Sequence, residues 1–391
     1  MTALAPATVP ASVIDRTRFT IDGGQQLESR IAQICTNVRD HIVAAFPASK
    51  LKGLLLAGGY GRGEGGVLRS MQGELPYNDL DFYLFASGSR VLNQKKYGAV
   101  LHHIAEELSA SAGIEIELKL DSLRHWRRMP VTMFSYDVSA AHKWITGDKS
   151  LLAGCDHHRY PQSIPISEAS RLLLNRCSGL LFAAEQLLRP TFDSRNADFV
   201  ARNVAKAQLA FGDAILVVFG LYHCSCLERA HRLSQLELRE PWFPEVCCHH
   251  AAGVEWKLHP LLAEPDRGGL QKLHREVTGF AWRIWQWLER RRLAIPCDSP
   301  SQYSFSSPHK WPGTNPLRNL LVNAKFFGLS GLCDRRYGRE RLFRALPVLL
   351  WDHDGLQDSA IVLQLRKWLK TNASSFPDLV NAYARIWRRF N

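Results

Sequence analysis

The chain has 391 residues, of which 46% are hydrophobic and 22% are charged, and its formal net charge is +12. This composition is typical of a globular protein and excludes a largely disordered chain, and the length predicts two domains. The longest apolar run, residues 209–222, is too short to span a bilayer and contains Asp213, so we expect no membrane association.

The positive charge is concentrated in the second part of the chain. Residues 1–160 contain 18 Lys and Arg against 16 Asp and Glu, whereas the remainder contains 31 against 21. A basic module favours anionic partners such as nucleotides or nucleic acid. The nine cysteines are an odd number spread along the chain, which is typical of reduced thiols in a cytoplasmic protein.

Residues 27–162 are predicted to form a small α/β domain after a flexible N-terminal segment over residues 1–26. Apolar residues recur at helical spacing in two segments, and short apolar or strictly alternating runs indicate strands. The expected elements are helices over 27–47 and 94–111, strands over 51–57, 79–85 and 114–120, and one or two further strands within 131–145.

Residues 163–391 are predicted to form an all-helical domain, because helical periodicity continues to the end of the chain. The expected helices cover 167–188, 196–222, 269–293, 316–327, 338–350, 357–370 and 376–390. The Ser- and Pro-rich segment 297–316 is predicted to be a loop that breaks this domain. The fold class is therefore α+β, with a small mixed sheet and flanking helices followed by an all-helical C-terminal domain.

Two aspartates stand one residue apart in the segment NDLDFYLF, residues 78–85. Because residues two apart in a strand project from the same face, Asp79 and Asp81 are expected to point together. Neighbouring carboxylates repel unless a cation lies between them, and Mg²⁺ is usually bound by one or two carboxylates together with substrate phosphates. Glu117, or Glu115 on the same face of the next strand, would complete a site for two ions.

A glycine-rich bend precedes these aspartates in the sequence LLLAGGYGRGEGG, residues 54–66. Gly58 and Gly59 follow a short strand, where backbone N–H groups can approach a phosphate without obstruction from side chains. Arg62 can bind the same phosphates through its charged guanidinium group. Together the two segments predict a bend that holds phosphates beside a strand that holds metal.

The order of these motifs resembles the DNA polymerase β-like nucleotidyltransferase superfamily. The residues of the two motifs most resemble those in the nucleotidyltransferase domain of the bacterial uridylyltransferases that modify the PII protein. GGYGRGE over residues 58–64 matches the first half of their motif, and GELPYNDLD over residues 73–81 matches the second. The resemblance covers residues 51–121 and implies a nucleotidyltransferase-type mixed sheet.

The chain departs from that motif between its two halves. Gly59 and Asp79 are 20 positions apart, which is longer than in the family, as if residues 65–72 were inserted. We expect this segment to be an enlarged loop at the mouth of the site. The departure leaves open whether Glu64 or Glu74 occupies the family position.

The resemblance implies that an NTP, with ATP or UTP expected, donates its nucleoside monophosphate to a hydroxyl acceptor and releases pyrophosphate. The implied site residues are Gly58 and Gly59 for the NTP, Asp79 and Asp81 for two Mg²⁺ ions, and Glu117 as the third acid and metal ligand, with Glu115 as its substitute. The third acid would help to deprotonate the acceptor. The alternative interpretation is that these acids are solvated or pair with Lys119 and Arg62.

A further basic group is predicted on the helix over residues 196–222. Asn203, Lys206 and Asp213 fall on one stripe of this otherwise apolar helix. By analogy with related enzymes, Lys206 would reach the triphosphate across a cleft between the domains. The equal alternative is a pair of Asp213 with Lys206 or with Arg202 that supports the helix, since buried polar groups need partners.

The sequence therefore predicts a cytoplasmic, Mg²⁺-dependent nucleotidyltransferase whose acceptor is a small molecule or a protein. A nucleic-acid acceptor is not favoured, because no recognisable RNA-binding module is present. The alternatives are a non-catalytic nucleotide-binding regulator or antitoxin-type partner, and an enzyme that modifies RNA ends. The last of these predicts an affinity for RNA that weakens steeply as salt rises.

Overall fold

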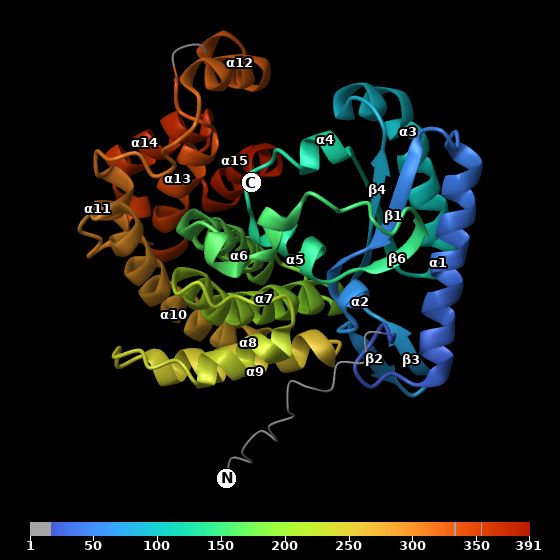
Figure 1. Cartoon of the computed structure of the whole chain (residues 1–391). Coiled ribbons are helices and arrows are strands. Elements are labelled where there is room, and N and C mark those ends of the chain that lie inside the picture. The colour runs from blue at the N-terminus through green and yellow to red at the C-terminus, as the bar shows by residue number, and fades with distance from the viewer. Residues whose placement is uncertain (1–16, 332–333, 353) are drawn as a thin grey trace. The chain divides into compact units, whose positions relative to one another are not determined.

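The computed structural model describes residues 17–331, 334–352 and 354–391 (Figure 1). The protein combines a small mixed sheet with many helices, including those at its C-terminal end, and so belongs to the predicted α+β class. The chain divides into two compact units. The first contains Met1–Pro165 and Leu216–Leu261, and the second contains Ile166–Ile215 and Leu262–Asn391.

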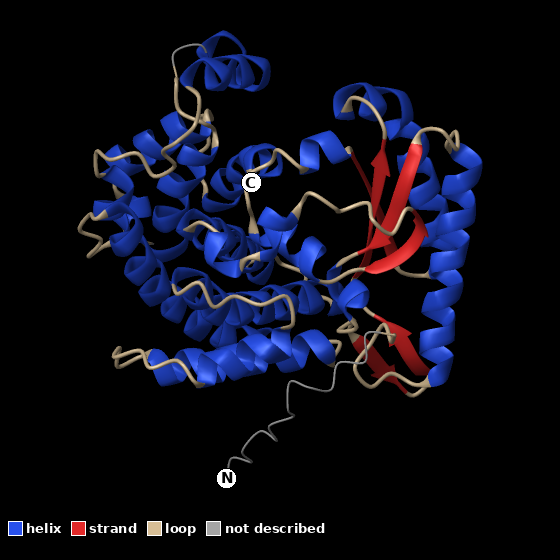
Figure 2. Cartoon of the chain, in the orientation of Figure 1, coloured by secondary structure: helices blue, strands red, loops and turns tan. Residues whose placement is uncertain are grey.

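The first unit contains a four-stranded sheet, a two-stranded sheet and the surrounding helices (Figure 2). Its main elements are α1 (Gln25–Ala45), β1 (Leu51–Leu56), α2 (Gly58–Arg62), β2 (Val67–Ser70), β3 (Gly73–Pro76), β4 (Asp79–Ala86), α3 (Arg90–Ala112), β5 (Glu115–Asp121), α4 (Leu123–Trp126), α5 (Met133–Ala140), β6 (Lys143–Gly147), α8 (Cys226–Ser234) and α9 (Phe243–Leu258). The last two helices come from a segment that the sequence placed in the helical domain.

The four-stranded sheet has the strand order β5-β4-β1-β6. The strand β4 runs parallel to β5 and antiparallel to β1, and β1 is antiparallel to β6. Both faces of β4 are covered, because Leu80 and Phe82 pack with α1 and α3 while Tyr83 and Phe85 pack with Trp126 on the other face. A strand buried on both faces has a nearly continuous apolar sequence, as β4 does after its aspartates.

The segment 131–145 differs from the prediction of strands, since α5 occupies most of it and only β6 is a strand. Thr132 accepts a hydrogen bond from the N–H of Ser135 at 2.9 Å, and the Ser135 hydroxyl accepts one from the N–H of Thr132 at 2.9 Å. This reciprocal cap stabilises the start of a helix. It outweighs the β-propensity of the β-branched and aromatic residues that suggested strands.

The segment 65–72 is not the expected enlarged loop. Half of it is β2, which pairs with β3 from Val67 opposite Pro76 to Ser70 opposite Gly73. Gly73 has a φ of +112°, a backbone conformation that other residues rarely adopt, and this allows the tight turn between the two strands. The apparent insertion is therefore half of a hairpin.

Residues 1–16 of the predicted flexible N-terminal segment lie outside the described residues. The part that is described is anchored, because Glu28 accepts hydrogen bonds from the N–H groups of Phe19 at 2.7 Å and Thr20 at 2.9 Å. The N–H of Gly65 also donates to the carbonyl of Phe19 at 3.0 Å. These contacts fix residues 19 and 20 beside the glycine-rich bend.

The second unit is helical. Its helices are α6 (Ile166–Leu187), most of α7 (Ser194–Val218), α10 (Arg267–Leu293), α11 (Pro300–Phe305), α12 (Pro316–Phe327), α13 (Arg339–Trp351), α14 (Ser359–Leu369) and α15 (Phe376–Phe390). The short helix α11 lies inside the predicted loop 297–316, where Ser299 caps it by accepting from the N–H of Gln302. No helix within the described residues is long and apolar enough to cross a membrane.

Candidate functional site

Four carboxylates share one face of the sheet at the start of two parallel strands. Asp79 of β4 lies opposite Glu115 of β5, and Asp81 lies opposite Glu117. Because side chains alternate along a strand, these four residues occupy the face opposite the one covered by α1 and α3. The acids singled out in the sequence are thus neighbours in space, and we call them the acidic face.

The glycine bend lies directly beside Asp81. The N–H of Ala57, the last residue before the bend, donates to the backbone carbonyl of Asp81 at 2.8 Å. Gly58 has a φ of +66°, and a side chain at this position would place its Cβ only 2.8 Å from Oδ2 of Asp81. Only glycine allows the bend and this carboxylate to approach so closely. Gly59 is similarly confined, because its Cβ would lie 2.9 Å from the carbonyl oxygen of Glu64.

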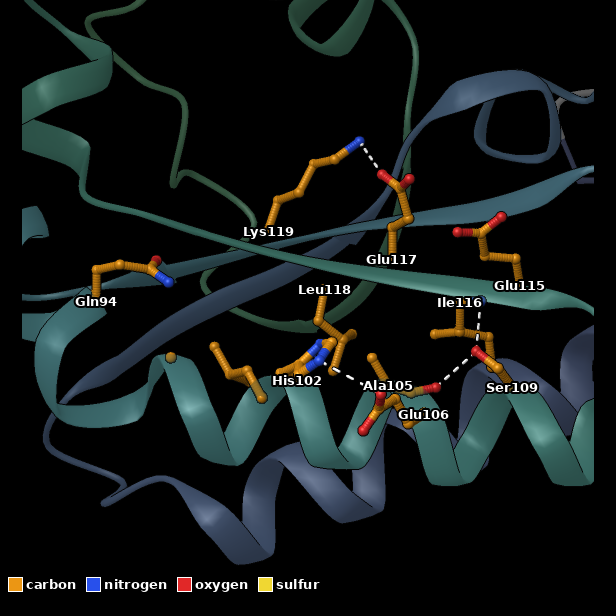
Figure 3. Close-up of a pocket in the computed structure, with 12 residues that line it drawn as sticks. Gln94, His102, Ala105, Glu106, Ser109, Glu115, Ile116, Glu117, Leu118 and Lys119 are labelled. Atoms are coloured by element: carbon orange, nitrogen blue, oxygen red, sulfur yellow. Dashed lines mark hydrogen bonds and ion pairs between the residues drawn. The ribbon is translucent and has the colours of Figure 1, made fainter. Parts of the chain in front are cut away.

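Lys119 joins two of the acids. Its Nζ lies 2.5 Å from Oδ1 of Asp81 and 2.6 Å from Oε2 of Glu117. Figure 3 shows this ammonium group above β5 with Glu115 and Glu117, while the side chains of α3 lie below the strand. Burial lowers the pKa of Lys119, but the charge of Asp81 and the hydrogen bonds to Asp81 and Glu117 together outweigh burial, so the pKa is raised above its usual value.

Tyr83 lies beneath Lys119 on the same face of the sheet. The two residues are opposite each other in the strand register, and the Nζ of Lys119 lies 5.3 Å from the centroid of the Tyr83 ring. The ring is buried against that of Phe134, with 5.0 Å between the centroids. Burial, followed by the charge of Asp81, raises the pKa of Tyr83 above its usual value. The phenol therefore stays neutral beside the acids.

Arg62 points to a different set of groups. Its Nη1 lies 3.4 Å from Oδ2 of Asp137, and its side chain is only 11% exposed. Burial lowers the pKa of Arg62, but the nearby negative charges, led by the carboxylates of Asp137 and Glu64, together raise it more, so the net shift is upward. Arg62 also lines a cavity of about 390 Å³ together with Ser139, His142 and Arg159. Its predicted contact with phosphates stays a prediction, with this cationic cavity as the available space.

The cationic cavity and the acidic face occupy the same end of the four-stranded sheet. His142 precedes β6, whose residue Lys143 pairs with Leu56 at the end of β1, and Leu56 in turn pairs with Phe82 next to Asp81. Adjacent strands lie about 4.8 Å apart. The acids of β4 and β5 and the cavity that His142 lines beside β6 therefore flank the glycine bend from opposite sides.

Glu64 and Glu74 have different surroundings. Glu64 is fully buried, and its carboxylate accepts hydrogen bonds from the hydroxyl of Ser225 at 2.5 Å and the N–H of Cys226 at 2.9 Å. The Nζ of Lys257 lies 3.6 Å away. Burial raises the pKa of Glu64. The charges of Lys257 and Arg62, with the two hydrogen bonds, lower it by more, and the pKa falls to about 2. Glu74 lies on β3 and pairs with Arg69 at the surface.

The Glu64 contacts show what sequence reasoning missed. Ser225 and Lys257 belong to the segment 216–261, which periodicity assigned to the helical domain. Glu64 binds the first N–H groups of α8, and these groups have no partner within a helix. The sequence shows an acid in a glycine-rich segment. It does not show the partners that bury this acid, because they are more than 160 positions away.

Lys206 lies on α7 in the second unit. On the same helix the Nδ2 of Asn203 donates to the carbonyl of Phe199 at 2.8 Å, and Asp213 is buried. The predicted contact of Lys206 with a triphosphate stays a prediction.

Among the described residues, no group of three or more His, Cys, Asp or Glu side chains is arranged to hold a metal ion. On the acidic face, Lys119 lies between two of the acids. The donors themselves suit magnesium, because hard divalent cations prefer carboxylate oxygens.

The chain matches no protein-family model, and a search of curated proteins returns no match. The function therefore has to be argued from the residues and their geometry.

Proposed function

We propose that this protein is a Mg²⁺-dependent nucleotidyltransferase that transfers a nucleoside monophosphate from an NTP to a hydroxyl acceptor. The observation that carries the proposal is the contact of Gly58 with the Asp81 carboxylate, together with the register that sets Glu117 opposite Asp81. A phosphate-binding bend and adjacent carboxylates are the two parts that this chemistry needs.

The fold of the first unit supports the following binding roles. Gly58 and Gly59 present backbone N–H groups at the start of α2, where the first N–H groups lack partners within the helix, to the phosphates of the NTP. Asp79 and Asp81 would ligate two Mg²⁺ ions with Glu117 or Glu115. Bound Mg²⁺ supplies neutralisation of the triphosphate and of the departing pyrophosphate.

The reaction is a displacement at the α-phosphorus. A bond forms between the acceptor oxygen and this phosphorus, and the bond between phosphorus and the bridging oxygen of the β-phosphate breaks. The acceptor proton passes to the third acid, Glu117 or Glu115, which shares a face with Asp79 and Asp81. Positioning and electrostatic stabilisation then provide most of the rate enhancement.

The test is incubation with each of the four α-labelled NTPs and Mg²⁺, with small hydroxyl compounds, proteins and RNA offered as acceptors. We expect pyrophosphate release and a labelled product, both lost in Asp79→Asn and Asp81→Asn. Glu106→Gln is the matched control, because this exposed acid of α3 pairs with His102 and is not part of the acidic face. Mass spectrometry of co-purified molecules would identify the nucleotidylated acceptor.

A second candidate function is a nucleotide-binding regulator without turnover. It is favoured by one observation, namely that Lys119, a cation of the protein itself, pairs with both Asp81 and Glu117. Such a protein would bind an NTP yet release no pyrophosphate with any acceptor offered. Binding without release would exclude the enzyme and select this alternative.

A further inference from the structure

The helix α12, which lies at the periphery of the second unit (Figure 1), has its polar side chains inward and its apolar ones outward. Asn319 and Asn323 are buried, whereas Leu317 and Leu321 are 74% and 73% exposed. Two positions correspond to about 200° around a helix, so the two pairs occupy opposite sides. A surface helix normally has the reverse arrangement, with its apolar side against the core.

Specific hydrogen bonds hold the asparagines inward. The Nδ2 of Asn319 donates to the carbonyl of Arg335 at 2.9 Å. The Nδ2 of Asn323 donates to the carbonyls of Asp334 and Arg336 at 2.8 and 2.7 Å. Turning the helix over would take these donors away from three backbone carbonyls. The outward position of the leucines therefore follows from the contacts that fix α12.

The outward apolar side is larger than two residues. Leu317 and Leu321 are neighbours one turn apart, and Leu329, in the turn Gly328–Gly331 that follows α12, is 85% exposed. Among the described leucines these three have the largest exposed fractions. Single exposed apolar residues are ordinary on a protein surface, but a group of them in one segment marks a contact site.

The same segment is positively charged. Residues 311–331 contain no Asp or Glu. The acid that follows, Asp334, pairs with Arg341 at 2.5 Å. Four exposed cations belong to the segment or follow it directly, namely Arg318, Lys325, Arg335 and Arg336. The exposed leucines therefore stand among basic side chains, and the surface that covers them should be anionic.

The charge and the residue types favour a lipid surface over a protein. A second copy of α12 would bring Arg318 and Lys325 against the same cations, and like charges repel. Leucine is under-represented among the residues that carry most of the energy of protein–protein binding. Helices that lie in the headgroup region of a bilayer, in contrast, combine Leu or Phe on one side with Lys and Arg.

We propose that α12 binds the surface of an anionic lipid bilayer, with Leu317, Leu321 and Leu329 inserted below the headgroups and the neighbouring cations at the lipid phosphates. A helix of 12 residues is about 18 Å long, too short to cross a hydrocarbon core of about 30 Å. The expectation of no membrane association came from the lack of a spanning segment, and surface binding needs none. The inference is independent of the proposed function, because the acidic face belongs to the first unit.

The test is co-sedimentation of the full chain with vesicles. One set contains phosphatidylcholine alone, and the other is an equal mixture of phosphatidylcholine and phosphatidylglycerol. We expect binding to the mixed vesicles to be stronger by at least about tenfold, since each basic residue near an anionic surface adds about fivefold. Binding should weaken as salt rises, because salt screens this attraction.

Paired substitutions separate the leucines from the cations. Leu317→Ser combined with Leu321→Ser should weaken binding to the mixed vesicles by at least about tenfold, because both side chains lose apolar contact with lipid. Arg318→Gln combined with Lys325→Gln should weaken binding to the mixed vesicles alone. Leu261→Ser combined with Leu262→Ser is the matched control, since these leucines are 69% and 63% exposed elsewhere. Thermal melting of each variant shows that the fold is retained.

Three results would overturn the inference. They are no binding to mixed vesicles, equal binding by the Leu317→Ser, Leu321→Ser variant, and equal binding to both kinds of vesicle. Sedimentation velocity without lipid tests the competing occupant. A dimer that is lost in the same leucine variant would assign α12 to a contact between copies and overturn the lipid assignment. Each of these results would leave the proposed nucleotidyltransferase activity untouched.

Discussion

The first unit contains two clusters of acids that differ in their partners. Glu64 is fully buried and binds Ser225, Cys226 and Lys257, so each side of its carboxylate is occupied by the protein. The acids of the acidic face are partly exposed, and Lys119 is the cation that joins Asp81 to Glu117. A carboxylate with buried protein partners stabilises the fold, whereas one with an exposed partner can exchange it for a ligand.

The largest expected effect is on the buried cluster. Glu64→Ala leaves Lys257 and the start of α8 without their anionic partner, and breaking a buried pair costs about 3–5 kcal/mol. Urea denaturation should show this loss in the free energy of unfolding. Glu74→Ala, which removes a surface pair with Arg69, should cost less than about 1 kcal/mol. Equal losses in the free energy of unfolding for the two variants would contradict the structural role of the Glu64 cluster.

The pH dependence of stability sharpens the same comparison. Burial raises the pKa of Glu64, but the charges of Lys257 and Arg62 and the hydrogen bonds from Ser225 and Cys226 together lower it more, from 4.5 to about 2. Folding therefore favours the charged form. The stabilisation, roughly 3 kcal/mol, is fully present above pH 4.5 and is lost as the pH falls toward 2. Denaturation of wild type and Glu64→Gln should converge over this interval, while a constant difference would contradict the assignment.

The glycine bend should show an intermediate effect. Gly58→Ala forces a side chain into a conformation with φ +66° and places its Cβ 2.8 Å from Asp81. The left-handed conformation alone costs a residue with a side chain about 1–2 kcal/mol. Thermal or urea denaturation would measure this loss, and NTP binding should weaken at the same time. Gly279→Ala, where a Cβ meets no atom within 4 Å, is the matched control.

The smallest effect on stability is expected at the acidic face. Lys119→Met removes a partly exposed ion pair, and such pairs contribute about 1 kcal/mol or less. The melting temperature should hardly change. If Lys119→Met destabilises the protein as strongly as Glu64→Ala, the lysine is a structural element and the contrast between the clusters fails.

The sequence predicted the parts of the site that depend on local patterns. Alternation placed Asp79 and Asp81 on one face, and it placed Glu115, Glu117 and Lys119 together on the next strand. The pairing of Lys119 with Asp81 was foreseen only as the alternative to metal binding. The sequence alone could not distinguish this pairing from metal binding, because the neighbours of Lys119 depend on the register between β4 and β5.

Long-range contacts were beyond the sequence patterns. Periodicity gives the boundaries of single helices but not the unit to which a helix belongs, so α8 and α9 were grouped with the helical domain. The helix α5 was read as strand because Thr132 and Ser135 form a reciprocal cap without the Glu or Gln that usually marks one. The hairpin of β2 and β3 was concealed by the glycines around it.

The three crossings of the chain between its units, after Pro165, Ile215 and Leu261, affect how the protein can be divided. A fragment that stops at Pro165 keeps all six strands, yet it discards the hydroxyl, the amide and the ammonium that surround Glu64. In such a fragment the carboxylate of Glu64 would lack these three partners. A fragment designed to fold as the first unit must therefore include residues 216–261, connected to the first segment by a linker.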